Sequence, residues 1–325
     1  MDVVYTDDGW IEQGYVKAYA LDLSYGTGEN DFELIVPIDF TTPKGALVYI
    51  DGTCWGGIIL ACSPSTLDYP PTNAITGLTW HGILAESYIC PSGASHVEVS
   101  GDANDAMREI VRRQGLDAMF DVQQRPSGYR VSYRFDRFTD VYSGFRKMLS
   151  KVGARLDIRK DPGCKPTLSA VEAGRYVDDF DSGRFRYEMT DATPYNHIIG
   201  IGKGELEERA VVHRYADEDG NISDVQTIFF PRERQYLYEL SGSEESELVE
   251  KCDEKLSDLQ DAFACELKVD GDEHYEVGDL VGIVDEGTGT SITSYVEKVI
   301  VKIDKEGANV TNEIGDVALA IKNKR

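Results

Sequence analysis

The spacing of apolar residues changes twice along the chain, and these changes constrain the fold more than any other feature. From residue 1 to about residue 100, and again from about residue 190, apolar and polar residues alternate in short runs. In between, two stretches repeat with the longer period of an amphipathic helix. Period two is typical of half-buried strands, and period 3.6 of helices. The pattern predicts an α+β protein with β-rich domains at 1–100 and 191–325 and a small α/β domain at 101–190.

The first β-rich segment contains a strong hairpin signal. Two β-prone runs, ALVYI and TCWGGIIL, are separated by Asp51-Gly52. An Asp-Gly pair is favoured in a type I′ turn because both central residues of that turn need positive φ. A loop rich in Pro, Ser, Thr and Asn is expected at 63–76, and a further β segment at LTWHGILAESYI.

The middle segment predicts the order helix, strand, helix, strand. One helix is expected to be capped by Asp102 and to stop at Gly115, and a second to start at Thr139 and stop at Gly153. The runs SGYRVSYRF and ARLDIRK alternate as strands. The segment also holds the densest group of cations, for which solvated faces paired with acid are favoured over a partner-facing surface: Arg108, Arg112, Arg113, Arg130, Arg134, Arg137, Arg146, Arg155 and Arg159.

The last segment contains one long helical pattern, near 243–265. Ser243 is its expected cap, and the acidic residues of its first turns suit the positive end of the helix dipole. Its buried side is expected to comprise Leu248, Cys252, Leu256, Leu259 and Phe263. Strands follow, with turns expected at Gly278-Asp279, Glu286-Gly287 and Glu306-Gly307.

The charge of the chain limits the partners that it could bind. Its 33 Lys and Arg against 58 Asp and Glu give a net charge of −25. Specific nucleic-acid binding is not expected, because it would need a basic footprint. Membrane insertion is not expected either, because no apolar run approaches the roughly 20 residues that span a bilayer. The N-terminus lacks the pattern of a signal peptide, so we expect a protein made and folded inside the cell.

Cysteine and histidine spacing gives no support for a disulfide framework or a metal site. The six cysteines are scattered without C-x-x-C, and are expected to be reduced core residues. The five histidines lack the H-E-x-x-H and H-x₃₋₅-H spacings, so half-buried strand positions are the favoured interpretation. We therefore expect no metal and no cofactor.

Catalytic motifs are not evident. Gly200-Ile-Gly202-Lys-Gly204 follows a strand, but Glu205 and a further strand follow it where a nucleotide-binding loop would need a small residue and a helix, so a β-turn is favoured. Acidic clusters begin at Asp178, Asp217 and Asp270, and none of them fits a calcium loop. No catalytic residue is assigned, and the protein is not expected to be an enzyme.

The order of five motifs resembles a known family. The motifs are GTCWGGII; TWHGILAESYICPSG followed by VSGDANDAMREIV; FRKMLSKVGARLDIR; NHIIGIGKGELEERAVVHRY; and YEVGDLVGIVDEGTGTSITSYVEKVIVKIDKEGANVTNEIGD. Together they cover most of residues 45–317. In this order they are similar to the central hub proteins at the tail tip of long-tailed bacteriophages. That class includes contractile baseplate hubs and the N-terminal part of tail-associated lysins.

The resemblance implies a fold, an assembly and a set of partners. It implies two β-barrel-like domains of the tail-tube type, with the α/β domain between them and a long helix in the C-terminal half. It implies a homotrimer whose six tube-like domains match the sixfold tail tube, and which closes or continues the tube and carries the host-recognition or lysin apparatus. The implied partners are distal tail and tail-tube proteins and the tape measure protein or tail fibre. The protein would be made in the bacterial cytoplasm and reside in the virion tail.

Two alternatives from other functional classes stay open. One is a tail-borne hydrolase of cell-wall glycan that uses paired carboxylates from the acidic clusters, because such pairs form in space and cannot be read from spacing. The other is a carbohydrate-binding receptor module that uses Trp10, Trp55 or Trp80.

Overall fold

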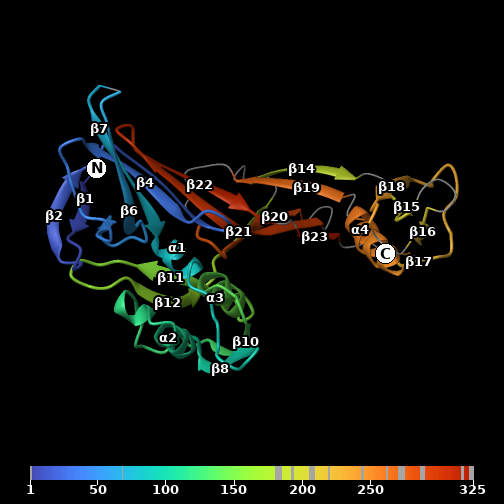
Figure 1. Ribbon diagram of the computed structural model, residues 1–325, viewed down its shortest axis with the longest axis horizontal. Coiled ribbons are helices and arrows are strands. Elements are labelled where there is room, and N and C mark those ends of the chain that lie inside the picture. Colours follow the sequence, from blue (N-terminus) through green and yellow to red (C-terminus); the bar gives the residue numbers. More distant parts are fainter. Residues whose placement is uncertain are drawn as a thin grey trace. The chain divides into compact units, whose positions relative to one another are not determined.

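The computed structural model describes most of the chain. The described residues are 2–67, 69–179, 185–191, 194–204, 209–218, 220–242, 245–260, 263–269, 275–285, 290–315 and 318–321. Within them the chain is mostly strand with four α-helices, so the expected α+β class is confirmed (Figure 1). Two compact units are present, one formed by residues 1–186 with 269–325 and the other by residues 187–268. The three-domain division with boundaries at residues 100 and 190 stays a prediction.

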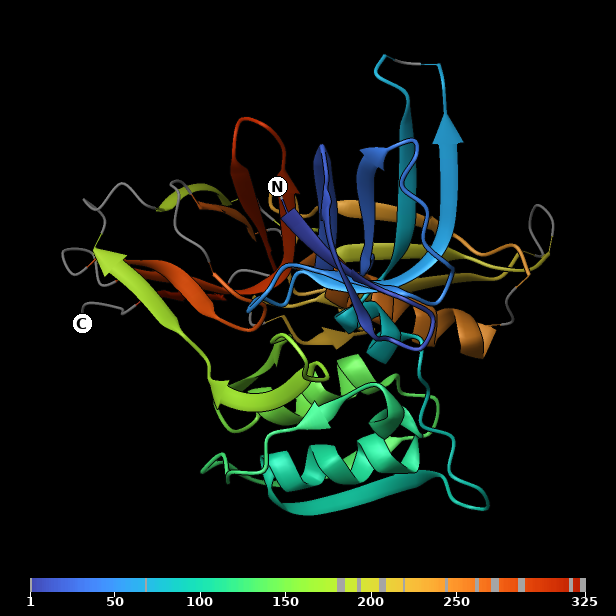
Figure 2. The ribbon, with the colours of Figure 1, turned by 90° about the vertical axis from the view of Figure 1, so that its left-hand side faces the viewer.

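One large sheet dominates the first unit (Figure 2). Its strand order is β13-β20-β21-β3-β4-β7-β6-β5-β1-β2, and β22 and β23 also pair with β21. The N-terminal strands are β1 (Asp2–Thr6), β2 (Glu12–Lys17), β3 (Ala20–Gly26), β4 (Asp31–Pro37), β5 (Leu47–Tyr49), β6 (Gly56–Ser65) and β7 (Thr72–Thr79). The C-terminal strands are β13 (Arg175–Asp179), β20 (Leu280–Asp285), β21 (Thr290–Ile303), β22 (Ala308–Ile314) and β23 (Ala318–Ile321).

The long strand β21 joins the two β-rich segments. Its first part pairs with β20, and its last part pairs with β3, from the start of the chain. The sheet curls until β2 contacts β4, but the described strand pairings do not close it into a barrel. The expectation of barrel-like domains is thus corrected to one open, curled sheet. Local alternation specifies which residues face the core, but it does not specify which distant edges pair.

The predicted hairpin forms between β5 and β6, with a longer connection than a two-residue turn. The strands pair from Leu47↔Ile58 to Tyr49↔Gly56, so six residues separate them. Gly52 has φ +71°, as the Asp-Gly signal requires. Thr53, in the same connection, forms an isolated bridge with Lys160. The connection is therefore held by a segment more than 100 residues away.

The α/β part of the first unit contains the two predicted helices and a short one. Its elements are α1 (Trp80–Ala85), β8 (His96–Asp102), α2 (Ala103–Arg113), a 3₁₀ turn η1 (Leu116–Ala118), β9 (Asp121–Val122), β10 (Arg130–Asp136), α3 (Val141–Ser150), β11 (Ala154–Arg159) and β12 (Thr167–Glu172). The cap of α2 is Asp102 as predicted, whereas α3 is capped by Asp140, one residue after the predicted start. Buried side chains of α2 and α3 share one core with Val4, Leu47 and Tyr49 of the first strands.

Helix α1 corrects an expectation, since the sequence pattern predicts a β segment here. Thr79 ends β7 and caps α1 by accepting a hydrogen bond from the Gly82 amide. Trp80, His81, Gly82 and Leu84 are all buried. A six-residue helix that is buried on nearly every side shows no polar face, so the period that identifies a helix is lost.

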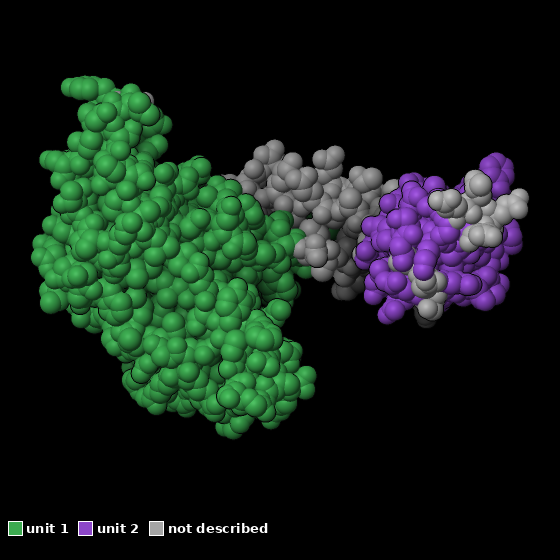
Figure 3. All heavy atoms as spheres, viewed as in Figure 1, with its two compact units in different colours: residues 1–186, 269–325 green, residues 187–268 purple. Residues whose placement is uncertain are grey.

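The second unit, purple in Figure 3, consists of residues 187–268. It contains a four-stranded sheet and one helix. Its sheet, in the order β17-β16-β15-β18, consists of β15 (His197–Ile201), β16 (Val211–Ala216), β17 (Ile222–Ser223) and β18 (Gln235–Glu239). Leu248, Cys252 and Leu256 of α4 (Glu245–Gln260) pack on Ile198 and Val212. The predicted helix was too long, because Phe263 already begins β19 (Phe263–Val269), which pairs with β14 (Phe185–Asp191).

Candidate functional site

The outer face of the large sheet carries rows of charged side chains. Asp22 of β3 lies between Lys302 of β21 and Glu33 of β4 in the strand register. Lys302 Nζ lies 3.0 Å from Asp22 Oδ2, and Lys298 Nζ lies 3.4 Å from Glu29 Oε2. The alternate positions of the same strands point to the opposite face and form the buried core.

A groove of about 610 Å³ runs across this charged face. Its lining contains four carboxylates, Asp22, Glu29, Asp31 and Glu33, against the two ammonium groups of Lys298 and Lys302. A phosphate backbone binds where cations release its counterions, so a surface with excess carboxylate repels it. The groove is therefore poorly suited to bind a phosphate backbone.

A buried cation ties the first strands to the α/β part. Lys160 is 4% exposed, and its Nζ lies 3.8 Å from the centre of the Tyr49 ring and 3.5 Å from Glu12 Oε1. The same Glu12 oxygen accepts hydrogen bonds from the Tyr49 hydroxyl and, at 2.7 Å, from the Gly163 amide. These contacts, the bond from Tyr49 first, lower the pKa of Glu12. This cluster of Glu12, Tyr49 and Lys160 therefore keeps opposite charges paired where β2, β5 and the end of β11 meet.

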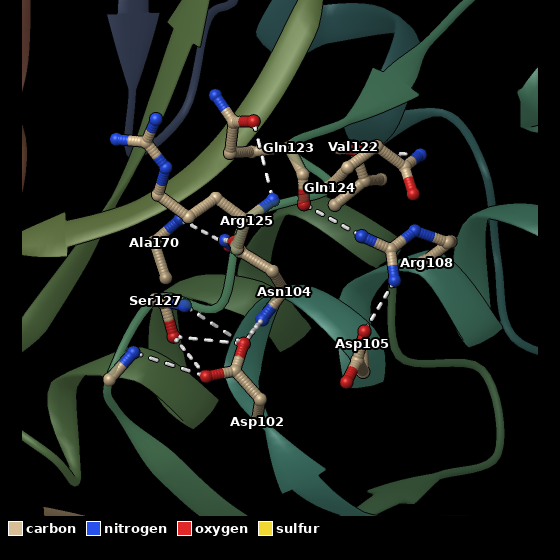
Figure 4. A network of polar contacts seen from close by, with 11 residues as sticks. Asp102, Asn104, Asp105, Arg108, Val122, Gln123, Gln124, Arg125, Ser127 and Ala170 are labelled. Carbon is tan, nitrogen blue, oxygen red and sulfur yellow. Dashed lines mark hydrogen bonds and ion pairs between the residues drawn. The ribbon is translucent and has the colours of Figure 1, made fainter.

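Side chains at the N-terminus of α2 form hydrogen bonds with the backbone of the loop that follows β9 (Figure 4). Asp102 accepts from the backbone amides of Asn104, Ser127 and Gly128 and from the Ser127 hydroxyl. Burial acts to raise the pKa of Asp102, but these hydrogen bonds to the ionised form outweigh it and lower the pKa.

Asn104, two residues further on, links the same loop to the neighbouring strand. Its side chain donates to Arg125 O at 2.8 Å and accepts from the Ala170 amide at 2.9 Å (Figure 4). Arg108, one turn later, donates to Gln123 O and pairs with Asp105. Most of these hydrogen bonds position backbone around the start of α2, so the network is a structural anchor.

A second buried group lies under the sheet, at α1. The His81 ring stacks on the Tyr25 ring with centroids 4.3 Å apart and meets Tyr142 edge-on at 5.3 Å. Burial lowers the pKa of His81 to about 3. Burial also raises the pKa of Tyr25, whose hydroxyl donates to Glu276 Oε2 at 3.0 Å. This contact links the first and last thirds of the chain.

The tryptophans considered for carbohydrate binding differ in exposure. Trp80 is fully buried, so its ring cannot stack on a sugar. Trp10 and Trp55 are half-buried, and the Trp10 indole donates to Gly45 O at 3.0 Å. Among the nine arginines of the middle segment, those that form ion pairs on exposed faces, as expected, are Arg113, Arg134 and Arg159. Arg108 and Arg155 also form ion pairs, but their side chains are only 16% and 18% exposed.

The glycine-rich run from Gly200 has a packing role at its first glycine. Gly200 lies inside β15, and a Cβ there would come within 2.3 Å of Cys252 Sγ. Gly204, with φ +113°, lies in the turn after the strand. Glu205, Ser243, Asp219, His274, the cluster at Asp270 and the turn at Glu286-Gly287 lie outside the described residues, as do the side chains of Asp178, Phe263 and Cys265.

Sequence spacing missed a group of titratable side chains in the second unit. His197 and His213 come together across β15 and β16, with Glu233 beside His197. The two histidines are sixteen positions apart in the sequence, so no local motif reveals them, and only the strand register does. In the part of the chain that the structure describes, no group of three or more His, Cys, Asp or Glu side chains could hold a metal ion. None of the described helices is long and apolar enough to cross a membrane.

Comparison with known proteins gives matches in structure but not in sequence. No protein-family model matches the chain, and no curated protein does. A tail protein from Neisseria meningitidis matches with a TM-score of 0.45 and 11% identity, over 97% of this chain and 96% of that one. Prophage tail protein gp18 from Listeria monocytogenes matches with a TM-score of 0.47 and 13% identity, over 97% and 95%.

A virion structure gives a similar result. A chain of the phage P2 baseplate in its activated conformation matches with a TM-score of 0.46 and 11% identity, over the whole of both chains. These three structures are described as a tail protein, a prophage tail protein and a phage baseplate.

Proposed function

We propose that this chain is a structural hub at the tip of a phage or prophage tail. In this proposal three copies form a ring that closes or continues the tail tube and carries the host-recognition or lysin apparatus. Its partners are distal tail and tail-tube proteins and the tape measure protein or tail fibre, and it resides in the virion tail. No catalytic step is assigned to it.

One observation carries the proposal: both ends of the chain build a single curled sheet with a carboxylate-rich outer face. Strand β21 makes this surface continuous from β13 to β2. The excess of carboxylates over ammonium groups in its groove disfavours phosphate binding. Both properties are compatible with the wall of a channel that conducts DNA, and the order of the sequence motifs supports a tail-tip hub.

The solution mass tests the proposal. Light scattering over a wide range of protein concentration is expected to give about three times the 36.1 kDa of one chain, and electron microscopy a ring with a central pore. A mass that stays at one chain, both alone and in mixtures with the tail proteins of the same phage, would refute the ring. A peptidoglycan zymogram adds a separate check, because clearing that disappears on substitution of one carboxylate would show a hydrolase.

A further inference from the structure

A groove of about 640 Å³ in the first unit carries an excess of positive charge. It is lined by residues of α3, of β11 and of β21, and by the chain just before β20. Its charged lining residues are four cations, Arg146, Lys147, Lys151 and Arg155, and one carboxylate, Glu297. This balance is opposite to that of the whole chain, whose net charge is −25. A cationic groove in so acidic a protein is a candidate site for an anionic partner.

Only one of the four cations is neutralised by a described residue. Arg155 Nε lies 3.0 Å from Oδ1 of Asp279, whose side chain is 2% exposed. Arg146, Lys147 and Lys151 form no ion pair within the described part of the chain. Lys147 and Lys151 are exposed at the end of α3, four residues apart and therefore on one side of the helix. The groove thus presents positive charge that a partner can neutralise.

Helix α4 of the second unit exposes a complementary row of carboxylates. Glu250, Glu254 and Asp258 are exposed and follow one another at intervals of four residues. Residues at this interval lie on one face of a helix, roughly 6 Å apart. None of the three forms an ion pair with a described residue, whereas Glu247 pairs with Lys251 at 2.6 Å. The carboxylate row therefore carries three negative charges that these residues do not neutralise.

We propose that the carboxylate row of α4 in one copy of the chain docks against the cationic groove of a second copy. Lys147 and Lys151 have the same spacing as neighbouring carboxylates of the row, so two ion pairs can form in register. Tyr295, which is 56% exposed and part of the groove lining, adds apolar surface to the contact. The contact rests on the proposed function and deepens it, since it names one interface of the proposed ring.

The contact joins two different surfaces, and this suits a ring. Each copy offers one groove and one carboxylate row, so every copy can bind a neighbour on either side. Head-to-tail contacts of this kind close into a ring when the rotation from copy to copy allows it. Salt screens the attraction between exposed charges, so the association is expected to weaken as the ionic strength rises.

Charge reversal followed by sedimentation velocity tests the contact. Lys147→Glu/Lys151→Glu reverses the groove, and Glu250→Lys/Glu254→Lys reverses the carboxylate row. Each double variant is expected to raise the dissociation constant for self-association at least about tenfold at low salt, because two attractions become two repulsions. An unchanged dissociation constant in either variant would overturn the contact.

Two other lysines provide a matched control. Lys17 and Lys44 are exposed and lie outside the groove. Lys17→Glu/Lys44→Glu changes the net charge by the same amount as the reversal of the groove, and should self-associate as the wild type does. An equal loss in this control would overturn the contact, because the effect would then reflect net charge alone.

An equimolar mixture of the two reversed variants distinguishes a contact between copies from one within a chain. In a mixed pair, the reversed groove of one variant faces the reversed row of the other, and the native groove faces the native row. The mixture is therefore expected to associate at least about tenfold more tightly than either variant alone. A mixture that associates no better than its components would overturn docking by a second copy.

The test does not depend on one variant. Lys151 Nζ lies 4.8 Å from the centre of the Tyr133 ring, so its substitution also removes a contact within the first unit. If the double variant fails to fold, Lys147→Glu at its exposed site and the α4 variant test the same contact.

The outcomes separate this contact from the hub function. A wild type that stays at the mass of one chain on its own overturns the contact, whereas the hub is refuted only if that mass persists in mixtures with the tail proteins. A stable trimer that neither reversal weakens overturns the contact and leaves the hub standing.

Discussion

Acidification is expected to destabilise the first unit through His81. The His81 side chain is 5% exposed, stacks on Tyr25, and has no hydrogen-bond partner at Nδ1 among the described residues. Burial lowers its pKa from 6.5 to about 3. The folded chain therefore binds fewer protons at this site than the unfolded chain between these two pH values, so stability falls as the pH falls.

The size of this effect follows from the two pKa values. Each pH unit below 6.5 costs about 1.4 kcal/mol until the folded pKa is reached, so His81 removes about 3 kcal/mol between pH 8 and pH 4.5. His81→Phe retains a ring to stack on Tyr25 and removes the titration. The unfolding free energy of this variant, minus that of the wild type, should therefore rise by about 3 kcal/mol as the pH falls from 8 to 4.5.

Urea unfolding followed by tryptophan fluorescence can measure this difference. All three tryptophans, Trp10, Trp55 and Trp80, belong to the first unit, so the signal reports that unit alone. Other groups titrate in the same range, but they do so equally in both proteins. His96→Phe, at a half-exposed site, is the control and should follow the wild type. Parallel pH profiles for wild type and His81→Phe would refute the reasoning.

Three further substitutions test the anchors of the two units. Asp102→Ala should destabilise the first unit by about 2 kcal/mol, measured by urea unfolding, because α2 loses its cap and the Ser127 loop its acceptor. Lys160→Met should cost about 2 kcal/mol in the same assay, because Glu12 is left without its cation. Gly200→Ala should cost about 1–3 kcal/mol in the second unit, followed by circular dichroism, because the new methyl group meets Cys252.

Each substitution has a control in the chain. Asp102→Asn keeps one acceptor oxygen, so it should be less damaging than Asp102→Ala. Lys147→Met, at an exposed site, should change stability by less than about 0.5 kcal/mol. Gly200→Ala combined with Cys252→Ala should cost less than the sum of the two single changes, because the smaller side chain makes room. Full additivity would contradict the proposed clash.

The sequence predicts those elements of the fold whose signals are local. Helices α2 and α3 each have an acidic cap, a sharp apolar stripe and a glycine after the last turn, so their positions are predicted to within a few residues. The end of α4 is harder to place, since the period changes within FACELKV, where Phe263, Cys265 and Leu267 alternate as in a strand. Helix α1 has no polar face and is missed for that reason.

The parts that could not be predicted depend on contacts between distant residues. The β3–β21 pairing joins residues more than 250 positions apart, and neither strand contains a local sequence signal that specifies its partner. Lys160 and Glu12 are likewise distant, and each alone resembles an ordinary surface charge. The diagonal of His197 and His213 exists only once the register of β15 and β16 is fixed. A histidine rule based on local spacing cannot find it.

The position of β21 in the sheet has a consequence for synthesis on the ribosome. Strand β3 is complete after Gly26, but its partner segment Lys298–Ile303 is translated about 270 residues later. At roughly 5–20 residues per second, the β3 edge is without this neighbour for roughly 15–50 s. An exposed strand edge is a template for pairing with another chain. Until the last strands are synthesised, the edge of β3 is therefore available to pair with another nascent chain.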